Sequence, residues 1–566
     1  MAAPHRVLLG IGVSAGTAHG AIALVTPAPT MDPNEAETTD VEVATQTVTD
    51  ALDTVARLLL ERAERAPEKA QEILNATAKM AKDRGLAKAI VKELKKGSGV
   101  TRAITDAIQK YVDMFVKLGG YMAERSTDLY DVRDRAIAVV RGLPMPGIPE
   151  LTEPSVIVAR DLAPAETATL NPELALGIIT EEGGPTSHTA ILAAQLGIPA
   201  AVRVRNIVGY ADDAQKHGVS IALDGGVGEV IIAPTEDDVE LLAERSKRRE
   251  AALAGSHGAG LTRDGHKIAL LANIGTADDA ARAAGYDVEG SGLFRTEFLF
   301  LGRETAPSVE EQTAVYTKVF EAFGTRRVTV RTLDAGADKP LKFADLGGEE
   351  NPALGRRGIR LTRIREELMD TQLQALAAAQ QATGADVRVM APMIATMEEA
   401  QWFADKARAV GLPSVGIMIE VPAAAINAST LLSIVDFASI GTNDLSQYTM
   451  AADRMQGELA ELLNVWQPAV LRMIRMACQG GTATGKYVGV CGEAGGDPLL
   501  ALVLTGLGVQ SLSMAPSKVD AVRASLKLHD LSACQQMAAY ALDAPTAQDA
   551  RAAVEALVHP DVKFLM

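Results

Sequence analysis

Short apolar segments alternate with helix-like segments through roughly the last 300 residues of the chain. About eight of these segments have the length and apolar content of strands, and the stretches between them repeat apolar residues at three- and four-residue steps. In chain order the strand-like segments are KIALLANIG, GSGLFRTE, RVTVRTLD, DVRVMAPMI, SVGIMIEV, FASIGTND, YVGVCGEA and SLSMAP. This alternation predicts a (β/α)₈ barrel, and a doubly wound open sheet is the alternative.

The chain has 566 residues, which is too many for one hydrophobic core and suggests about three domains. From Asp32 to about Arg141, proline is almost absent and apolar residues recur with helical spacing, with a turn at Lys95–Gly99. Strand-like segments lie on both sides of this helical part. They are residues 6–27 before it and SVIVARDL, LGIIT, GIPAAV, VSIALDG and GEVIIAP after it. We therefore expect an α/β domain that carries an inserted or accompanying helical subdomain.

These patterns divide the chain into four expected parts. They are an α/β domain at residues 1–30 and 144–235, a helical subdomain at 31–143, a linker at 236–256 and the barrel at 257–566. The linker contains the charged run EDDVELLAERSKRREAALAG, which predicts an exposed helix. Such a helix between two halves could serve as a hinge.

His188 lies in GGPTSHTAILAAQLGIPA, a pattern that predicts a sharp turn at residues 183–184 and a helix from near the histidine to Gly197. Thr186 or Ser187 could cap this helix, whose unpaired N–H groups and dipole favour negative charge at that end. Because a neutral imidazole is nucleophilic near pH 7, His188 could accept a phosphoryl group. The alternative is that His188 only contributes to the helix cap.

Polar residues stand at the carboxyl ends of the predicted barrel strands, where barrels of this kind hold their active sites. They are Arg295, Arg331, Asp334, Glu420, Asn443, Asp444 and Cys491. Any one of the charged residues could form an ordinary surface salt bridge. The whole set at the same end of successive strands is much less expected by chance, and it predicts a functional site.

The residue types in this set suit a small phosphorylated acid. Glu420 and Asp444 on neighbouring strands could hold Mg²⁺ and leave coordination positions for substrate oxygens and water. Asn443 could orient a substrate carboxylate by hydrogen bonding. Planar guanidinium groups suit phosphate and carboxylate, and four arginines would supply them. They are Arg295, Arg331, Arg357 and Arg454.

Cys491 follows the apolar run VGV and precedes GEAGG, which allows close backbone approach. A thiol with an ordinary pKa near 8.5 is mostly protonated at neutral pH, so Cys491 could donate a proton to an enolate carbon. The alternative is a buried structural cysteine, the role that we assign to Cys478 and Cys534.

Composition excludes several classes of function. A net charge of −17 argues against general nucleic-acid binding, and no apolar run is long enough to cross a bilayer. With three cysteines, no CxxC motif and no signal-peptide pattern, we expect a cytoplasmic protein without disulfides or zinc. The segment GIGVSAG from Gly10 resembles a dinucleotide-binding loop only superficially, because a strand-like AIALV follows it where that loop needs a helix.

Seven motifs occur along the chain in a familiar order. They are GGPTSHTAILAAQLGIPA, GLFRTEFLF, VRTLDAGADKP, ENPALGRRGIR, GIMIEVPAA, GTNDLSQY and GVCGEAGGDP. Over essentially its whole length the chain resembles Enzyme I of the bacterial phosphoenolpyruvate-dependent sugar phosphotransferase system. The resemblance implies a swivelling phosphohistidine domain with an inserted helical subdomain, followed by the barrel. It also implies that the helical part docks the phosphocarrier protein HPr and that the barrel half forms a homodimer.

The resemblance also implies a role for each candidate residue. By it, His188 is the phosphorylated histidine, Cys491 protonates the enolate, and Glu420 and Asp444 bind Mg²⁺. The contacts to phosphoenolpyruvate that it implies are Arg295, Arg331, Arg357, Asn443, Asp444 and Arg454. This chain departs most from the family pattern in its helical part, where the segment MAERSTDLYDVRD matches the corresponding family segment only loosely.

The resulting hypothesis is autophosphorylation of His188 by phosphoenolpyruvate followed by transfer to HPr, with the charged helix as the pivot of the swinging domain. A pyruvate-phosphate dikinase or phosphoenolpyruvate synthase is one alternative, although the N-terminal third contains no Walker loop for a nucleotide. A barrel scaffold or regulator without turnover is the other.

Overall fold

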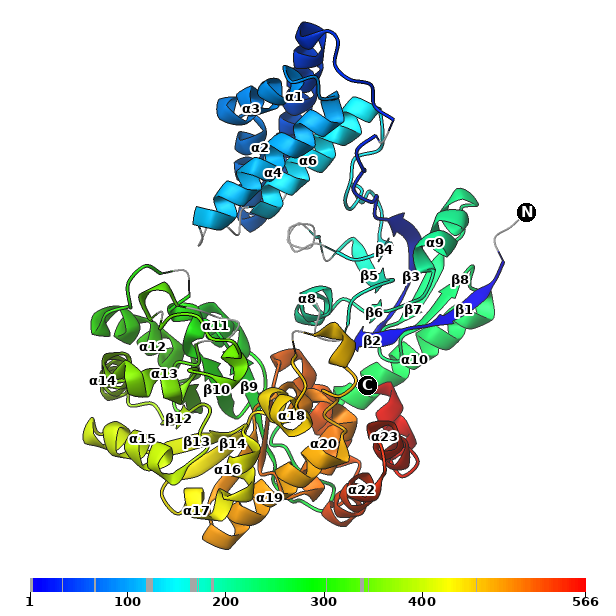
Figure 1. Cartoon of the computed structure of the whole chain (residues 1–566). Coiled ribbons are helices and arrows are strands. Elements are labelled where there is room, and N and C mark those ends of the chain that lie inside the picture. Colours follow the sequence, from blue (N-terminus) through cyan, green and yellow to red (C-terminus); the bar gives the residue numbers. More distant parts are fainter. Residues whose placement is uncertain are drawn as a thin grey trace. The chain divides into compact units, whose positions relative to one another are not determined.

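The computed structural model divides the chain into two compact units, Met1–Lys247 and Arg248–Met566 (Figure 1). It describes residues 4–32, 34–65, 68–118, 126–162, 170–171, 173–184, 188–301, 303–335, 341–344, 346–454 and 456–565. One helix, α10 (Glu236–Ala254), runs across the boundary between the units. In the described part of the chain, no helix has both the length and the apolar character needed to cross a membrane.

The second unit contains a closed barrel of parallel strands, as the alternating pattern predicted. The strands follow one another around the barrel in chain order, and β16 pairs with β9 to close it. Their bounds are β9 (Ala269–Ile274), β10 (Gly290–Arg295), β11 (Arg327–Arg331), β12 (Val387–Ala391), β13 (Val415–Ile419), β14 (Phe437–Ile440), β15 (Tyr487–Val490) and β16 (Ser511–Met514). Each strand falls within one of the segments expected from the sequence, so the prediction of a (β/α)₈ barrel is confirmed.

Helices connect the strands and cover the outside of the barrel (Figure 1). They are α11 (Ala277–Ala284), α12 (Val309–Phe323), α13 (Ile359–Ile364), α14 (Glu366–Thr383), α15 (Met397–Ala409), α16 (Pro422–Ile426), α17 (Ala428–Leu432), α18 (Thr442–Met450), α19 (Pro468–Thr484), α20 (Pro498–Gly506), α21 (Val519–Lys527), α22 (Leu531–Asp543) and α23 (Ala547–Glu555). Thr276, Ser308 and Thr396 start three of these helices with reciprocal capping boxes. Such caps satisfy backbone N–H groups that have no partner within the helix.

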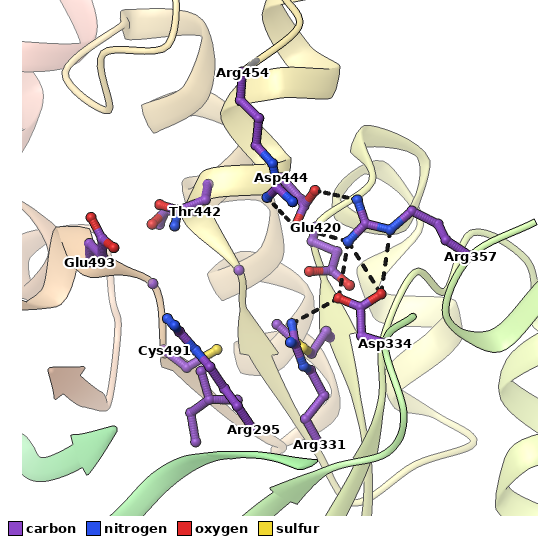
Figure 2. A pocket seen from close by; sticks show the side chains of 15 residues that line it. Arg295, Arg331, Asp334, Arg357, Glu420, Thr442, Asp444, Arg454, Cys491 and Glu493 are labelled. Carbon is purple, nitrogen blue, oxygen red and sulfur yellow. Dashed lines mark hydrogen bonds and ion pairs between the residues drawn. The ribbon is translucent and has the colours of Figure 1, made fainter. Parts of the chain in front are cut away.

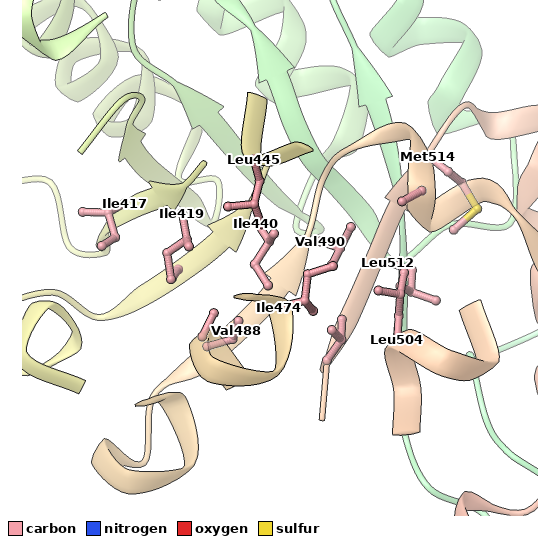
Figure 3. Packing of buried hydrophobic residues seen from close by; sticks show 14 of the residues in the cluster. Ile417, Ile419, Ile440, Leu445, Ile474, Val488, Val490, Leu504, Leu512 and Met514 are labelled. Carbon is pink, nitrogen blue, oxygen red and sulfur yellow. The ribbon is translucent and has the colours of Figure 1, made fainter. Parts of the chain in front are cut away.

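The two faces of the barrel strands differ in character. At the carboxyl ends, the side chains that point into the barrel are mostly charged or polar (Figure 2). On the outer face, Ile417, Ile419 and Ile440 pack with the apolar faces of the helices (Figure 3). The apolar layer between strands and helices therefore holds the barrel together and leaves its mouth available for chemistry.

The first unit contains an eight-stranded mixed sheet in the order β1-β8-β7-β3-β4-β5-β6-β2. Its strands are β1 (Arg6–Leu9), β2 (Ile11–Ser14), β3 (Thr17–Leu24), β4 (Ser155–Ala159), β5 (Ala175–Thr180), β6 (Ala200–Val202), β7 (Ile221–Asp224) and β8 (Glu229–Ile232). The sequence predicted strands in all of these regions. The segment from Gly10 forms β2 and leads into β3, so the strand expected in place of a dinucleotide-binding helix is present.

Helices occupy the chain between β3 and β4 in the described residues, and they pack on one another. They are α1 (Val41–Arg65), α2 (Glu68–Ala81), α3 (Arg84–Leu94), α4 (Val100–Leu118) and α6 (Ser126–Arg141). Val55, Ile90 and Ile104 are fully buried in their shared core. The predicted turn at 95–99 separates α3 from α4.

Helix α10 is anchored differently at its two ends. Leu242 packs with Ala222 and Ile231 of the sheet in the first unit. Arg249 donates to the Phe564 carbonyl at 3.2 Å, and Leu253 packs beside Leu565, both in the second unit. Most of the remaining residues of the helix are exposed, as the charged run predicted.

Candidate active site

A cavity opens at the carboxyl ends of the barrel strands, and all the predicted barrel site residues line it (Figure 2). They are Arg295, Arg331, Asp334, Arg357, Glu420, Asn443, Asp444, Arg454 and Cys491. Each comes from the end of a strand or from the loop or helix that follows it. The parallel barrel therefore brings together residues that lie up to about two hundred positions apart in the sequence. Their functional roles remain predictions.

A row of side chains with alternating positive and negative charge crosses this cavity. Arg357 donates to Asp444 at 2.8 Å and to Asp334 at 3.0 Å. Arg331 lies 3.0 Å from Asp334 and also donates to Glu297, and Arg454 lies 3.7 Å from Asp444. Figure 2 shows Asp334 and Asp444 on either side of the Arg357 guanidinium. Glu297, Asp334 and Asp444 thus each contact at least one guanidinium, which makes burial of these charges possible.

Arg331 and Arg357, at the centre of this row of charges, are permanently charged. Burial alone would lower the pKa values of Arg331 and Arg357, but neighbouring carboxylates raise both above the ordinary range. For Arg331 the largest of these charges is that of Glu297, and for Arg357 it is that of Asp334. Two buried guanidinium groups therefore line the cavity, and planar groups of this kind suit phosphate or carboxylate oxygens.

Glu420 lies directly after β13 and is almost completely buried. Its Oε1 accepts a hydrogen bond of 2.6 Å from the backbone N–H of Met393. Burial, followed by the negative charges of Asp444 and Asp334, raises the pKa of Glu420 to about 8. A carboxylate in these surroundings is more stable when a cation lies beside it.

Glu420 and Asp444 fit a divalent cation. They follow the paired strands β13 and β14, and carboxylate oxygens are the ligands that Mg²⁺ prefers. Within the described residues, no group of three or more His, Cys, Asp or Glu side chains is placed to hold a metal ion. Two carboxylates would therefore leave the remaining coordination positions to substrate oxygens and water, as the sequence analysis expected.

Cys491 follows β15 and is 1% exposed. Its Sγ lies 3.6 Å from the carbonyl oxygen of Ile440, and burial raises the pKa of the thiol to about 11. The sequence analysis assumed an ordinary thiol pKa, and this assumption is wrong because the side chain is desolvated. The thiol is therefore protonated at neutral pH, which is the state that the predicted proton donor requires.

Comparison with known proteins identifies the family. Three regions match families described as "PEP-utilising enzyme, N-terminal" at residues 9–125, "PEP-utilising enzyme, mobile domain" at 151–228 and "PEP-utilising enzyme, PEP-binding domain" at 250–531. The chain is 46% identical to the "Phosphoenolpyruvate-protein phosphotransferase" of Streptomyces coelicolor, over 98% of this chain and 99% of that protein. The chain belongs to the phosphoenolpyruvate-protein phosphotransferase family.

Other members of the phosphoenolpyruvate-protein phosphotransferase family show the same extended similarity. The protein of that name from Listeria monocytogenes is 36% identical over 97% of this chain and 99% of its own length. The one from Haloferax volcanii is 39% identical over 86% of each chain. A solved structure titled as an Enzyme I NMR structure covers 43% of this chain and 99% of its own, with 31% identity and a TM-score of 0.38.

The remaining predicted site residue, His188, lies in the first unit. Helix α8 (His188–Leu196) begins at the histidine, as the turn pattern predicted. Gly183 has a φ of 92°, which permits the sharp turn before it. The predicted capping residues Thr186 and Ser187 lie outside the described residues, as does the side chain of His188.

Among the residues of the site that sequence reasoning missed, two are buried and polar. Glu297 is 2% exposed and pairs with Arg331, although its position directly after a strand, in the motif GLFRTEFLF, could have signalled it. Thr442 is fully buried and lines the cavity, and its Oγ1 has no hydrogen-bond partner among the described residues. A Cβ at Gly492 would lie 1.9 Å from that oxygen, so only glycine leaves room for the hydroxyl.

Proposed function

We propose that the protein transfers the phosphoryl group of phosphoenolpyruvate to His188 and then to the phosphocarrier protein HPr. The observation that supports this best is one cavity lined by buried arginines, by acidic side chains that include Glu420 and Asp444, and by a protonated thiol. These groups match the three parts of phosphoenolpyruvate, which are a phosphoryl group, a carboxylate and a carbon that must gain a proton. Membership of the phosphoenolpyruvate-protein phosphotransferase family supports the same reaction.

In this proposal the arginines hold the anionic groups of the substrate. Arg295, Arg331 and Arg357 contact the phosphoryl oxygens and offset the charge that develops on them during transfer. Asn443 and Arg454 orient the carboxylate. Glu420 and Asp444 would hold Mg²⁺, which supplies further charge stabilisation when it is bound.

The chemical step exchanges one bond to phosphorus for another. A ring nitrogen of His188 attacks phosphorus in line, the N–P bond forms, and the P–O bond to the enolate breaks. The enolate takes up a proton at its terminal carbon from the Cys491 thiol, which gives pyruvate. Transfer from phospho-His188 to HPr completes the cycle.

The proposal assigns a task to each part of the chain. Residues 1–30 and 144–235 carry the phosphohistidine, 31–143 dock HPr, 236–256 act as the pivot, and 257–566 bind phosphoenolpyruvate and form a homodimer. We place the reaction in the cytoplasm. The continuous helix α10 and its separate anchors support the role of the pivot.

The test is labelling with ³²P-phosphoenolpyruvate and Mg²⁺ in the absence of nucleotide. We expect an acid-labile label on the intact chain that is lost in His188→Ala and that moves to added HPr. A requirement for ATP or AMP would instead indicate a dikinase or synthase, and no label under any condition would indicate a scaffold. His217→Ala is the matched control, because His217 is an exposed histidine of the first unit that takes no part in the proposed reaction and should leave labelling unchanged.

A further inference from the structure

Strand β15, which leads to Cys491, is weakly joined to the next strand of the barrel. Its register with β16 consists of the single pair Val490↔Leu512, whereas β14 and β15 share four pairs. The Cys491 N–H donates to the Ile440 carbonyl on the β14 side at 3.0 Å. The Cys491 carbonyl lies beyond the last β15–β16 pair and needs another donor.

Asn273 of β9 supplies that donor. Its Nδ2 lies 3.1 Å from the Cys491 carbonyl oxygen and 3.5 Å from the Ser513 carbonyl oxygen. Since β9 is separated from β15 by β16, this side-chain amide reaches across β16 to the end of β15. In the described residues, no backbone hydrogen bond to this carbonyl competes with the amide.

Ser513 fixes which end of the amide faces Cys491. Its Oγ donates to Oδ1 of Asn273 at 2.6 Å, which leaves Nδ2 to donate toward Cys491. Ser513 is 1% exposed, and a Cβ at Gly292 would lie 2.6 Å from its Oγ. The serine hydroxyl is therefore held tightly in place on the inner side of the barrel.

We propose that Asn273, oriented by Ser513, is a positioning residue that fixes the Cys491 backbone and hence the direction in which its thiol delivers a proton. This inference rests on the proposed function. In the step concerned, the S–H bond of Cys491 breaks as a C–H bond forms at the terminal carbon of the enolate. The resulting thiolate regains a proton from water after pyruvate leaves. Displacing the thiol slows this step and leaves the phosphoryl transfer, which uses other residues, nearly unchanged.

The experiment separates the two steps in a single turnover of the full chain. Rapid quenching measures ³²P label on the protein, and lactate dehydrogenase measures pyruvate. The test variants are Asn273→Asp, which removes the donor without changing size, and Ser513→Ala, which removes the group that orients the amide. Ser511→Ala is the matched control, because Ser511 lies two residues earlier in β16, lines the inside of the barrel and has no hydrogen bond to Asn273.

We expect the ratio of pyruvate formation to labelling to fall about tenfold to a hundredfold in both test variants. The solvent deuterium isotope effect on pyruvate formation should rise in them, and Ser511→Ala should match the wild type. If labelling and pyruvate formation stay coupled in the test variants, the positioning role is overturned. If Asn273→Asp does not fold, as judged by circular dichroism, Ser513→Ala alone decides.

Two comparisons distinguish this inference from the proposed function. A wild-type chain that takes no label contradicts the proposed function itself. Cys491→Ala must separate labelling from pyruvate formation, and if it does not, both the proton-donor role and the positioning role are wrong. Separation in Cys491→Ala without separation in either test variant overturns only the role of Asn273.

Discussion

The guanidinium of Arg357 lies 2.8 Å from the carboxylate of Asp444. A predicted phosphate ligand and a predicted metal ligand are thus paired with one another across 87 positions of the sequence. Because Arg357 also bridges to Asp334 at 3.0 Å, its position depends on two acids at once. In the proposed function, substrate binding by Arg357 and metal binding by Asp444 would therefore be coupled through this ion pair.

Replacing Arg357 with lysine tests this coupling. Lysine keeps the charge but cannot contact Asp334 and Asp444 with a planar fork, so we expect kcat/KM for phosphoenolpyruvate to fall about 100-fold. Steady-state kinetics with HPr as acceptor measure the change. Arg356→Lys is the control, since Arg356 pairs with Glu349 outside the cavity, and an equal effect of both substitutions would contradict the prediction.

Glu420→Gln tests the predicted metal ligand. The substitution preserves an acceptor for the Met393 N–H and removes a charge that Asp444 and Asp334 disfavour. We expect phosphoenolpyruvate-dependent labelling to fall about 100-fold or more, with a melting temperature in chelator no lower than that of the wild type. A variant with a lower melting temperature, and with a loss of activity that matches its loss of folded protein, would indicate a structural role for Glu420.

Thr442→Val tests whether the unpaired hydroxyl binds substrate. The substitution keeps the shape of the side chain and removes Oγ1, a buried oxygen that lacks a partner within the described residues, from a residue that lines the cavity. A hydrogen bond to an anionic ligand contributes about 1.5–3 kcal/mol, so we expect KM for phosphoenolpyruvate to rise at least about tenfold. Thr442→Ser should restore most of the affinity, and a valine variant with unchanged KM would show that the hydroxyl does not contact substrate.

The ionisation of Cys491 should occur far above neutral pH. The pKa of this thiol is raised from 9.0 to about 11. The absorbance of a thiolate near 240 nm can be followed as the wild-type spectrum minus the Cys491→Ala spectrum, and we expect no such signal up to about pH 9. The folded state binds this proton more tightly than the unfolded state does. Its contribution to stability is therefore full below pH 9 and is lost as pH rises through about 11. A difference signal that develops near pH 8 would contradict the burial of the thiol.

The barrel and most of its site could be predicted from the sequence because two regular patterns encode them. Strand length and helical spacing give the order of elements, and the residue at the end of each strand must lie at the barrel mouth, as Arg295 and Glu420 do. Outward-facing residues such as Ile440 are equally regular, since they pack on the helices (Figure 3).

The remaining features depend on contacts between distant segments. The pairing of Glu297 with Arg331 spans 34 positions. The space for the Thr442 hydroxyl depends on Gly492, about 50 positions later in the sequence. The pKa of Cys491 depends on complete burial, which local sequence does not reveal. The amide of Asn273 contacts the Cys491 carbonyl 218 positions away, and no local sequence pattern predicts this contact.

Within helix α10, Arg245 pairs with Asp224 of the sheet, and Arg249 donates to the Phe564 carbonyl beside the barrel. Only one helical turn separates these two attachments. A glycine-rich tether would let the phosphohistidine search a sphere, with an encounter frequency set by tether length. In the proposed function, a stiff helix would instead restrict the movement of His188 to the arc that one bending or unwinding turn allows, so residues 246–248 would govern the rate of phosphoryl delivery more than the length of the connection does.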